Sequence, residues 1–415
     1  LAIETEAGIE AWLVEAREIP MIALELRFDG GAAREPAELA GVTSLMTGLL
    51  GRGAGELDAA AFEAAADRAA LRFGASAGRD AVSVSARMLT ETRDEAVELL
   101  RLALTSPRFD ADAVARAKAR RRSGLASEET DPGAQAAKAW RAALFPDDPY
   151  GRPLDGTPET VGRIDRAALE AARARALNRA GLSVAIVGDI GPKAATALLD
   201  RLLADLPSRP RDPLPPADLS DERGLQVVPL DAPQAVARLV QEGVGREDPD
   251  FFAAVVMNEI LGAGGFASRL TEEVRVKRGL TYSVSSFLAR FDRAAVLGAQ
   301  VSSDNARIAE ALEVIRAEWA RMRDEGPTEA EVEAARRQIT GSWPLAFDSN
   351  ASIARLLAGY KAEGLDPGYL DRRNARIAAV TREDAARVAA RLLRPELLLT
   401  VVVGRPEGLE EAPGG

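Results

Sequence analysis

The sequence predicts an α+β protein with two related domains, each a largely antiparallel sheet covered by helices. Two observations lead to this fold class. The second half of the chain repeats the pattern of the first half, and a proline-rich segment lies between them. At 415 residues the chain is also long enough for two domains.

Both halves open in the same way, with two apolar runs separated by a short turn. GIEAWLVEA precedes Pro20 and MIALELRFDGG, while GLQVVPLDA precedes Pro233 and QAVARLVQEG. Short apolar runs bounded by glycine and proline are typical of strands, and strand pairs joined by short turns favour an antiparallel sheet. In each half a helix is then expected to open after a charged turn that contains Pro36 or Pro249.

The ends of the two halves also match. Residues 163–190 align without a gap with residues 379–406, so that Gly188 falls on Gly404. Each copy has the pattern of an amphipathic helix, a short break and a buried strand that ends in glycine. Helix-period stretches at 59–70 and 307–323 are expected to cover one face of each sheet.

A stiff linker is expected between the halves. Five prolines break helix and disfavour a central strand there; they are Pro207, Pro210, Pro213, Pro215 and Pro216. We therefore expect an N-terminal domain at 1–204, a linker at 205–223 and a C-terminal domain at 224–415.

Composition narrows the possible partners. The formal net charge of −11 argues against nucleic acid or anionic lipid as the main partner. Membrane insertion is not expected, because the longest apolar runs, such as 397–404, are far shorter than the ~20 residues of a membrane helix. The chain starts at Leu1, which suits a bacterial periplasmic protein after leader removal, with the cytoplasm as the alternative.

Three segments carry a resemblance to a known family. The C-terminal half contains Ser268-Arg269-Leu270 and then VRVKRGLTYSV at 274–284, and the N-terminal half contains FPDDPYGRPLDGTPETV at 145–161. With residues 41–54, these segments resemble the pitrilysin family of inverted zincins, which includes the mitochondrial processing peptidase. The resemblance extends from about Gly8 to Gly404.

Catalytic members of that family carry a His-x-x-Glu-His helix that holds zinc and a general base. Here the two ligand positions fall on Ser44 and Gly48, and the base position falls on Thr47. The family's third ligand, a glutamate, should fall near Gly124, about a turn away from Glu128 and its neighbour.

A catalytic zinc in this chain is physically implausible, because the sequence contains no histidine and no cysteine. No Asp-x-Asp-x-Asp-Gly loop points to calcium. Residues 41–54 are instead expected to form an ordinary core helix; its apolar face would be Val42, Leu45, Met46, Leu49 and Leu50.

The resemblance implies a different role for the C-terminal half. In the family, an arginine and a tyrosine seven positions apart reach into the zinc site of the opposing half, where they hold the scissile carbonyl and the developing oxyanion. The matching residues are Arg275 and Tyr282. A guanidinium and a phenol hydroxyl are fixed donors suited to that charge.

The local sequence around this pair adds detail. Gly279 is expected to turn the chain out of a helix, and strand alternation would place Tyr282, Val284 and Ser286 on one face. Lys277 and Arg278 are expected to be surface charges. The alternative is that Arg275 is a solvated residue near a helix end and Tyr282 a half-buried strand aromatic.

Family members also bind substrate as an added strand at a sheet edge in the N-terminal domain. Residues 73–88 occupy the corresponding place here. Small residues would permit close approach of a peptide; they are Ala75, Ser76, Ala77 and Gly78. The alternative is a plain strand with alternating Val82 and Val84.

Together these observations predict a zinc-free subunit of a two-subunit zinc metallopeptidase that cleaves peptides. This chain would bind no cofactor itself, and a homologous catalytic subunit would supply the zinc motif. One alternative is a non-enzymatic scaffold or peptide-binding protein of the same fold. Another is a homodimer that only binds peptides.

Overall fold

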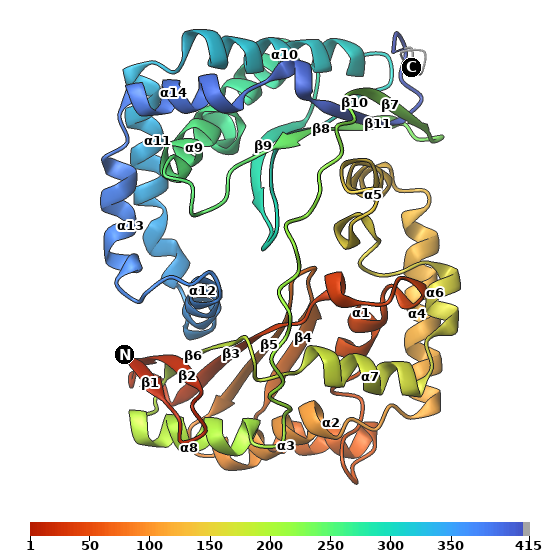
Figure 1. Cartoon of the computed structure of the whole chain (residues 1–415), viewed down its shortest axis with the longest axis vertical. Coiled ribbons are helices and arrows are strands. Elements are labelled where there is room, and N and C mark those ends of the chain that lie inside the picture. Colours follow the sequence, from red (N-terminus) through yellow and green to blue (C-terminus); the bar gives the residue numbers. More distant parts are fainter. Residues whose placement is uncertain (410–415) are drawn as a thin grey trace. The chain divides into compact units, whose positions relative to one another are not determined.

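A computed structural model describes residues 1–409 and divides the chain into two compact units (Figure 1). The first unit comprises Leu1–Leu125, Arg152–Pro213 and Pro344–Leu370. The second comprises Ala126–Gly151, Leu214–Trp343 and, within the described chain, residues 371–409. These units cut across the expected boundaries at 204 and 224, because each contains a segment from the other half of the sequence.

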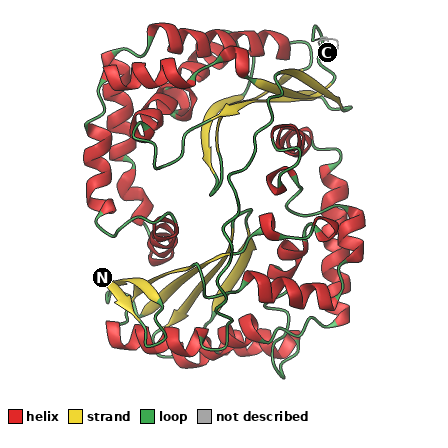
Figure 2. Ribbon diagram, in the orientation of Figure 1, coloured by secondary structure: helices red, strands yellow, loops and turns green. Residues whose placement is uncertain are grey.

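Each unit is built on one sheet, drawn in yellow in Figure 2. The two sheets have corresponding strand orders. The first sheet has the order β1 (Ala2–Glu4), β2 (Glu10–Glu15), β6 (Leu182–Gly188), β3 (Met21–Asp29), β5 (Ala81–Leu89) and β4 (Arg72–Ala77). The second has the order β7 (Gly224–Pro229), β11 (Leu399–Gly404), β8 (Gln234–Glu242), β10 (Ala295–Asp304) and β9 (Ser283–Arg290). From β2 onward the order matches strand for strand, which supports the internal repeat.

The sheets are largely antiparallel, as predicted, with one parallel contact in each, β2 with β6 and β7 with β11. The two opening runs of each half do not pair with each other. The closing strand of each half, β6 or β11, lies between them. The reason is burial: β6 and β11 are apolar and buried over nearly their whole length, so a central position covers both their faces and both their edges.

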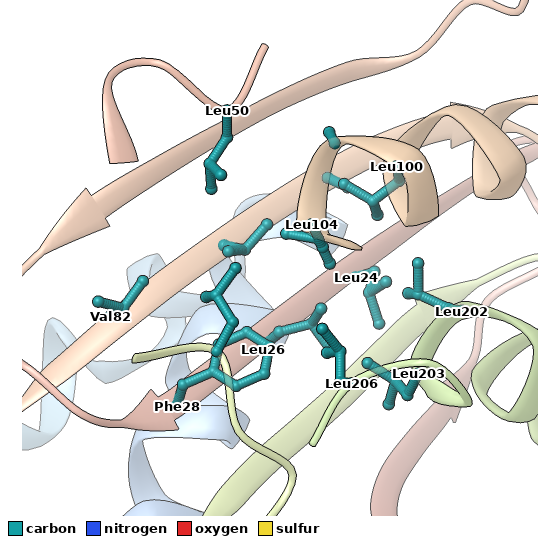
Figure 3. Close-up of a cluster of buried hydrophobic side chains, with 14 of the residues drawn as sticks. Leu24, Leu26, Phe28, Leu50, Val82, Leu100, Leu104, Leu202, Leu203 and Leu206 are labelled. Carbon is teal, nitrogen blue, oxygen red and sulfur yellow. The ribbon is translucent and has the colours of Figure 1, made fainter. Parts of the chain in front are cut away.

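The first unit has its main core between one face of the sheet and a layer of helices. These are α2 (Ala59–Arg68), α3 (Arg93–Thr105), α7 (Arg166–Ala176) and α8 (Pro192–Leu203). Figure 3 shows Leu24, Leu26 and Phe28 of β3 among leucines of α3 and α8. Fully burying such a side chain contributes about 1.5–3 kcal/mol. Alternate residues of β3 face this core, so the residues between them face the opposite side of the sheet.

The second unit has a matching layer of helices. It comprises α9 (Phe251–Asn258), α10 (Ile308–Glu325), α11 (Glu329–Gly341) and α14 (Arg382–Leu392). Helix α13 (Tyr369–Ala378) spans the boundary between the two units. The predicted helices at 59–70 and 307–323 are α2 and α10. The bounds of α7 and α14 differ by the predicted offset of 216 at both ends. Gly188 and Gly404 end the two closing strands with φ of 144° and 148°.

The opposite face of each sheet is covered by a helix from the other half of the chain. In the first unit, α12 (Asn350–Ala362) packs on β6 and β3, with Ala354, Leu357 and Ala358 against Trp12 and Val187. In the second, α5 (Pro132–Leu144) packs on β8 and β11. The boundary between units therefore falls inside α4 (Ala111–Glu128), and contiguous domain boundaries could not describe the fold.

The remaining elements are short. They are α1 (Val42–Thr47), α6 (Pro158–Arg163), two π-helical turns, η4 (Glu259–Ala263) and η6 (Thr271–Val276), and short 3₁₀ turns. Residues 207–223 contain no helix or strand, as the prolines predict. Within residues 1–409, no helix combines the length and apolarity that crossing a membrane requires.

A buried ion pair joins the loop after α5 to the second unit. Arg293 donates to both carboxylate oxygens of Asp148, at 2.9 and 2.7 Å, and the two side chains are only 8% and 11% exposed. The Arg293 guanidinium also lies over the Tyr150 ring, 4.3 Å from its centroid. Tyr150 packs in turn on Phe145 and Phe291. This cluster holds the transferred segment in place.

Removing one partner of this pair should destabilise the protein strongly. Asp148→Ala leaves the Arg293 guanidinium buried without its carboxylate, which typically costs about 3–5 kcal/mol. Replacing both charges with apolar residues, in Asp148→Leu with Arg293→Met, should restore much of that loss. Urea unfolding followed by tryptophan fluorescence measures both. A double variant as unstable as the single one would contradict this account.

Candidate functional site

The segment that matches the family's zinc helix is a short, capped core helix. The Glu35 carboxylate accepts hydrogen bonds from the backbone N–H groups of Gly41, at 2.9 Å, and Thr43, at 2.6 Å, at the start of α1. Burial raises the pKa of Glu35, and these hydrogen bonds oppose the rise. Gly41 has φ of +90° and lies against the Asp155 backbone, so a side chain would not fit there. The helix ends at Thr47, within the expected segment 41–54, and the five apolar residues predicted for its core face are all buried, two of them after the helix end.

An arginine occupies the neighbourhood of the first lost ligand position. The hydroxyl of Ser44 donates to Asp155 Oδ1 at 2.6 Å and accepts from Arg121 Nη2 at 2.8 Å. Arg121 also forms an ion pair with Asp155. The three side chains close a network that joins α1, α4 and the loop before α6. A guanidinium thus supplies positive charge where catalytic relatives would hold a metal ligand.

The sequence analysis did not identify Arg121. Its position on α4 could have pointed to it, because Arg121 lies three residues before Gly124, where the family's third ligand falls. Gly124 itself has open space around it. Within residues 1–409, no group of three or more acidic side chains is arranged to hold a metal ion.

The other two lost-motif positions lie beside the edge strand. Thr47 is buried and donates to the Ser44 carbonyl at 3.0 Å, whereas Gly48 is exposed. Both line a cavity of about 360 Å³ together with Phe73 and Ala75 of β4. The structure therefore brings the degenerate zinc motif and the predicted peptide-binding edge together.

Part of the segment predicted to bind a peptide lies at a sheet edge. In the described chain β4 pairs only with β5, so its outer edge is open. Residues 73–88 form a hairpin, however, and not a single strand. Ala75, Ser76 and Ala77 lie on β4, while Gly78 lies in the turn, where its N–H donates to Ala81 and its carbonyl accepts from Ala32. Gly78 is thus not part of the open edge.

In the second unit, most cations of the family motif have partners within the unit. Arg269 forms a bidentate pair with Glu331, at 2.6 and 2.8 Å. Lys277 and Arg278 both bind Glu273, at 2.8 and 2.6 Å. Lys277 and Arg278 are exposed, as predicted for surface charges, and both also neutralise the Glu273 carboxylate.

Arg275 and Tyr282 differ from these residues. Within residues 1–409, neither side chain forms a hydrogen bond or an ion pair. Tyr282 is 82% exposed, and the Arg275 guanidinium lies 4.7 Å from the ring centroid of Phe266, which is 74% exposed. Arg275 lies on the π-helical turn η6, and such turns are frequent at functional sites. Gly279 follows with φ of +59°, as predicted for the turn out of the helix.

Tyr282 does not share a face with Val284 and Ser286, contrary to the alternation expected. Val284 and Ser286 are buried, but Tyr282 precedes β9 and faces solvent. The reason is an anchor at Thr281, whose hydroxyl donates to the Ser302 carbonyl and accepts from the Ser283 N–H. This local turn directs Tyr282 outward, so the alternation of buried and exposed residues begins only after it, in β9.

Comparison with known proteins identifies the family. Residues 13–158 match the model described as insulinase (peptidase family M16), and residues 163–339 match that of the peptidase M16 inactive domain. The chain belongs to peptidase family M16. The match agrees with the pitrilysin resemblance, and the chain is a member without the zinc-motif residues.

Individual relatives agree. A Helicobacter pylori protein named non-peptidase homolog YmxG is 26% identical, over 87% of this chain and 83% of its own length. The beta subunit of the mitochondrial-processing peptidase from Lentinula edodes is 23% identical, over 92% and 85%. The crystal structure of a peptidase M16 inactive domain from Pseudomonas fluorescens superimposes with a TM-score of 0.92 at 28% identity, covering 100% of this chain and 99% of that one.

Restoring the zinc motif alone should not restore zinc binding. We expect Ser44→His, Thr47→Glu, Gly48→His and Gly124→Glu together to bind zinc weakly, because the Arg121 guanidinium repels the ion and engages its neighbours. Adding Arg121→Ala should increase the affinity by at least tenfold. Zinc content after dialysis measures this, with wild type and Arg121→Ala alone as controls. Equal zinc content with and without Arg121 would contradict this interpretation.

The Glu273 cluster predicts a pH dependence. Lys277 and Arg278 lower the pKa of Glu273 to about 2, so its stabilising contribution is present above the ordinary glutamate pKa and disappears as the pH falls toward 2. Glu273→Gln should therefore lower Tm at pH 7, and the difference from wild type should shrink between pH 4.5 and 2. Calorimetry at several pH values measures this. A difference independent of pH would show that the charge is not responsible.

Proposed function

We propose that this protein is the zinc-free subunit of a two-subunit zinc metallopeptidase and that it donates Arg275 and Tyr282 to the active site of a catalytic partner. The partner would be a homologous subunit that carries the zinc and the His-x-x-Glu-His helix. The substrates would be peptides. The periplasm, expected from the sequence, remains the proposed location.

The observation that carries this proposal is the contrast among the cations of one motif. Arg269, Lys277 and Arg278 are held by carboxylates of the second unit. Arg275, on the same short stretch, forms no ion pair within residues 1–409, and the nearby Tyr282 is the most exposed of the large side chains named for this site. Two neighbouring donors without a hydrogen-bond or ion-pair partner among residues 1–409 are available to an external ligand.

The chemistry fits these two groups. Hydrolysis of a peptide bond at a zinc-bound water produces a tetrahedral oxyanion, which fixed donors stabilise. A guanidinium and a phenol hydroxyl can both donate hydrogen bonds to that oxyanion. The stacking of Arg275 on Phe266 limits the rotamers of the guanidinium while leaving its N–H groups available. Zinc and the attacking water would come from the partner.

The experiment has two stages. The tagged protein is purified from its natural host, and proteins that copurify are tested for the zinc motif and for peptidase activity in the mixture. Arg275→Ala and Tyr282→Phe are then compared with wild type. Removal of one such donor typically costs 10²–10³-fold in kcat, so we expect a loss of about that size for each. Arg163→Ala, at an exposed arginine elsewhere, serves as the control.

Two results would reject the proposal. Activity of the mixture that is unchanged by both substitutions would show that the pair does not reach the reacting atoms. Peptide hydrolysis by this chain alone would show that it needs no partner. The alternative function is a non-enzymatic scaffold or peptide-binding protein. The name non-peptidase homolog given to the Helicobacter relative suits this alternative, and peptide binding without activity in any mixture would favour it.

A further inference from the structure

A polar cavity lies in the first unit, on the face of the sheet opposite the leucine core. It has a volume of about 420 Å³ and lies between α12 and strands β3, β5 and β4. Strand alternation explains its character. Leu24 and Ala86 point into the core, so Glu25 and Ser85 point to the other side. The helix covers only the apolar part of this face, which leaves the polar part open.

The floor of the cavity is a row of aligned residues that crosses three strands. Gly74 pairs with Ser85, and Ser85 pairs with Glu25. Glu25 is only 4% exposed and accepts a hydrogen bond of 2.5 Å from the Ser85 hydroxyl. Burial raises the pKa of Glu25, and the Ser85 hydrogen bond and the charge of Arg355 oppose the rise. The single carboxylate of the cavity is thus shielded at its base.

The accessible charges of the cavity are positive. Arg87 on β5 and Arg355 on α12 both line it and are exposed. Within residues 1–409 neither forms a hydrogen bond or an ion pair through its side chain. Arg72, the third arginine of the lining, is already paired with Asp67. Two guanidinium groups therefore face the cavity without a hydrogen-bond or ion-pair partner in the described chain, and the one carboxylate of the lining, Glu25, is buried.

The cavity opens toward the free edge of the sheet. Gly74 lies on the edge strand β4, has no side chain, and has no atom within 4 Å of the place where a Cβ would be. A peptide paired with the outer edge of β4 would therefore have an unobstructed path for a side chain across Gly74 toward Ser85 and Arg87. Edge strands bind peptides through backbone groups, and neighbouring pockets then select side chains.

We propose that this cavity binds a carboxylate carried by a peptide that lies along β4, with Arg87 and Arg355 as its ligands. The carboxylate is either an acidic side chain or the C-terminal group, since both present the same two oxygens to guanidinium donors. The inference deepens the proposed function, because it names the class of peptide that the chain selects. It does not depend on Arg275, Tyr282 or the catalytic partner.

The test uses the isolated full chain and titration calorimetry with blocked pentapeptides. Acetyl-Val-Thr-Glu-Val-Thr-amide is compared with peptides that carry Gln or Lys in the central position, and with the Gln peptide as a free C-terminal acid. At least one carboxylate-bearing peptide should bind about tenfold more tightly than the blocked Gln peptide. The two carboxylate peptides together identify which source is preferred.

Variants connect the preference to the two arginines. Arg87→Gln with Arg355→Gln should abolish the difference between carboxylate and Gln peptides, while Arg120→Gln, at an exposed arginine on α4, should preserve it. Circular dichroism and thermal unfolding verify that the variants are folded. If the double variant fails to fold, the single Arg355→Gln variant, changed on the helix alone, takes its place. This variant should reduce the preference for carboxylate peptides.

Several results would overturn the inference. These are equal binding of carboxylate and Gln peptides, a preference that persists in the double variant, or no binding of any peptide at 1 mM. Tighter binding of the Lys peptide would instead identify Glu25 as the recognising group. Because no partner is present, this test can fail while the mixed-enzyme experiment succeeds, and the reverse also holds.

Discussion

The packing of α12 and α5 on sheets built mainly by the other half of the chain is the constraint on which the fold depends. Each sheet has two faces with apolar residues. One is covered by helices of the same half, but Trp12, Ala185 and Val187 on the other face of the first sheet are covered by Ala354, Leu357 and Ala358 of α12. Neither unit has a complete core without the exchanged helix, so each unit needs residues from both halves of the sequence in order to fold.

A second set of contacts holds the segment that matches the family's zinc helix. A metal ion bound between helices contributes to their association, and its loss leaves ligands and space unsatisfied. In this chain Ser44, Asp155 and Arg121 form a polar network that joins the same helices through hydrogen bonds and an ion pair. In this protein the guanidinium of Arg121 therefore links these elements.

The sequence predicted the features that arise from local patterns. The strands, the helices α7 and α14, the extended linker and the turn at Gly279 follow from periodicity, proline and glycine, which act over a few residues. The insertion of β6 and β11 into their sheets and the exchange of α5 and α12 could not be predicted in this way, because they depend on contacts between residues more than a hundred positions apart. At the candidate site, the motif identified Arg275 and Tyr282. The outward direction of Tyr282 depends on the hydrogen bonds of Thr281 to Ser302 and Ser283, which no spacing rule reveals.

The exchange of helices has a consequence for biosynthesis. Residues 1–213 contain every strand of the first sheet, but the helix that covers its second face begins at Asn350. At a ribosomal rate of about 5–20 residues per second, the nascent first unit therefore exposes Trp12 and Val187 for roughly 7–30 s before that helix is made. During this interval the exposed apolar face favours aggregation of the nascent chain. Only the rate of elongation sets the length of this interval, so a slower rate of initiation does not shorten it.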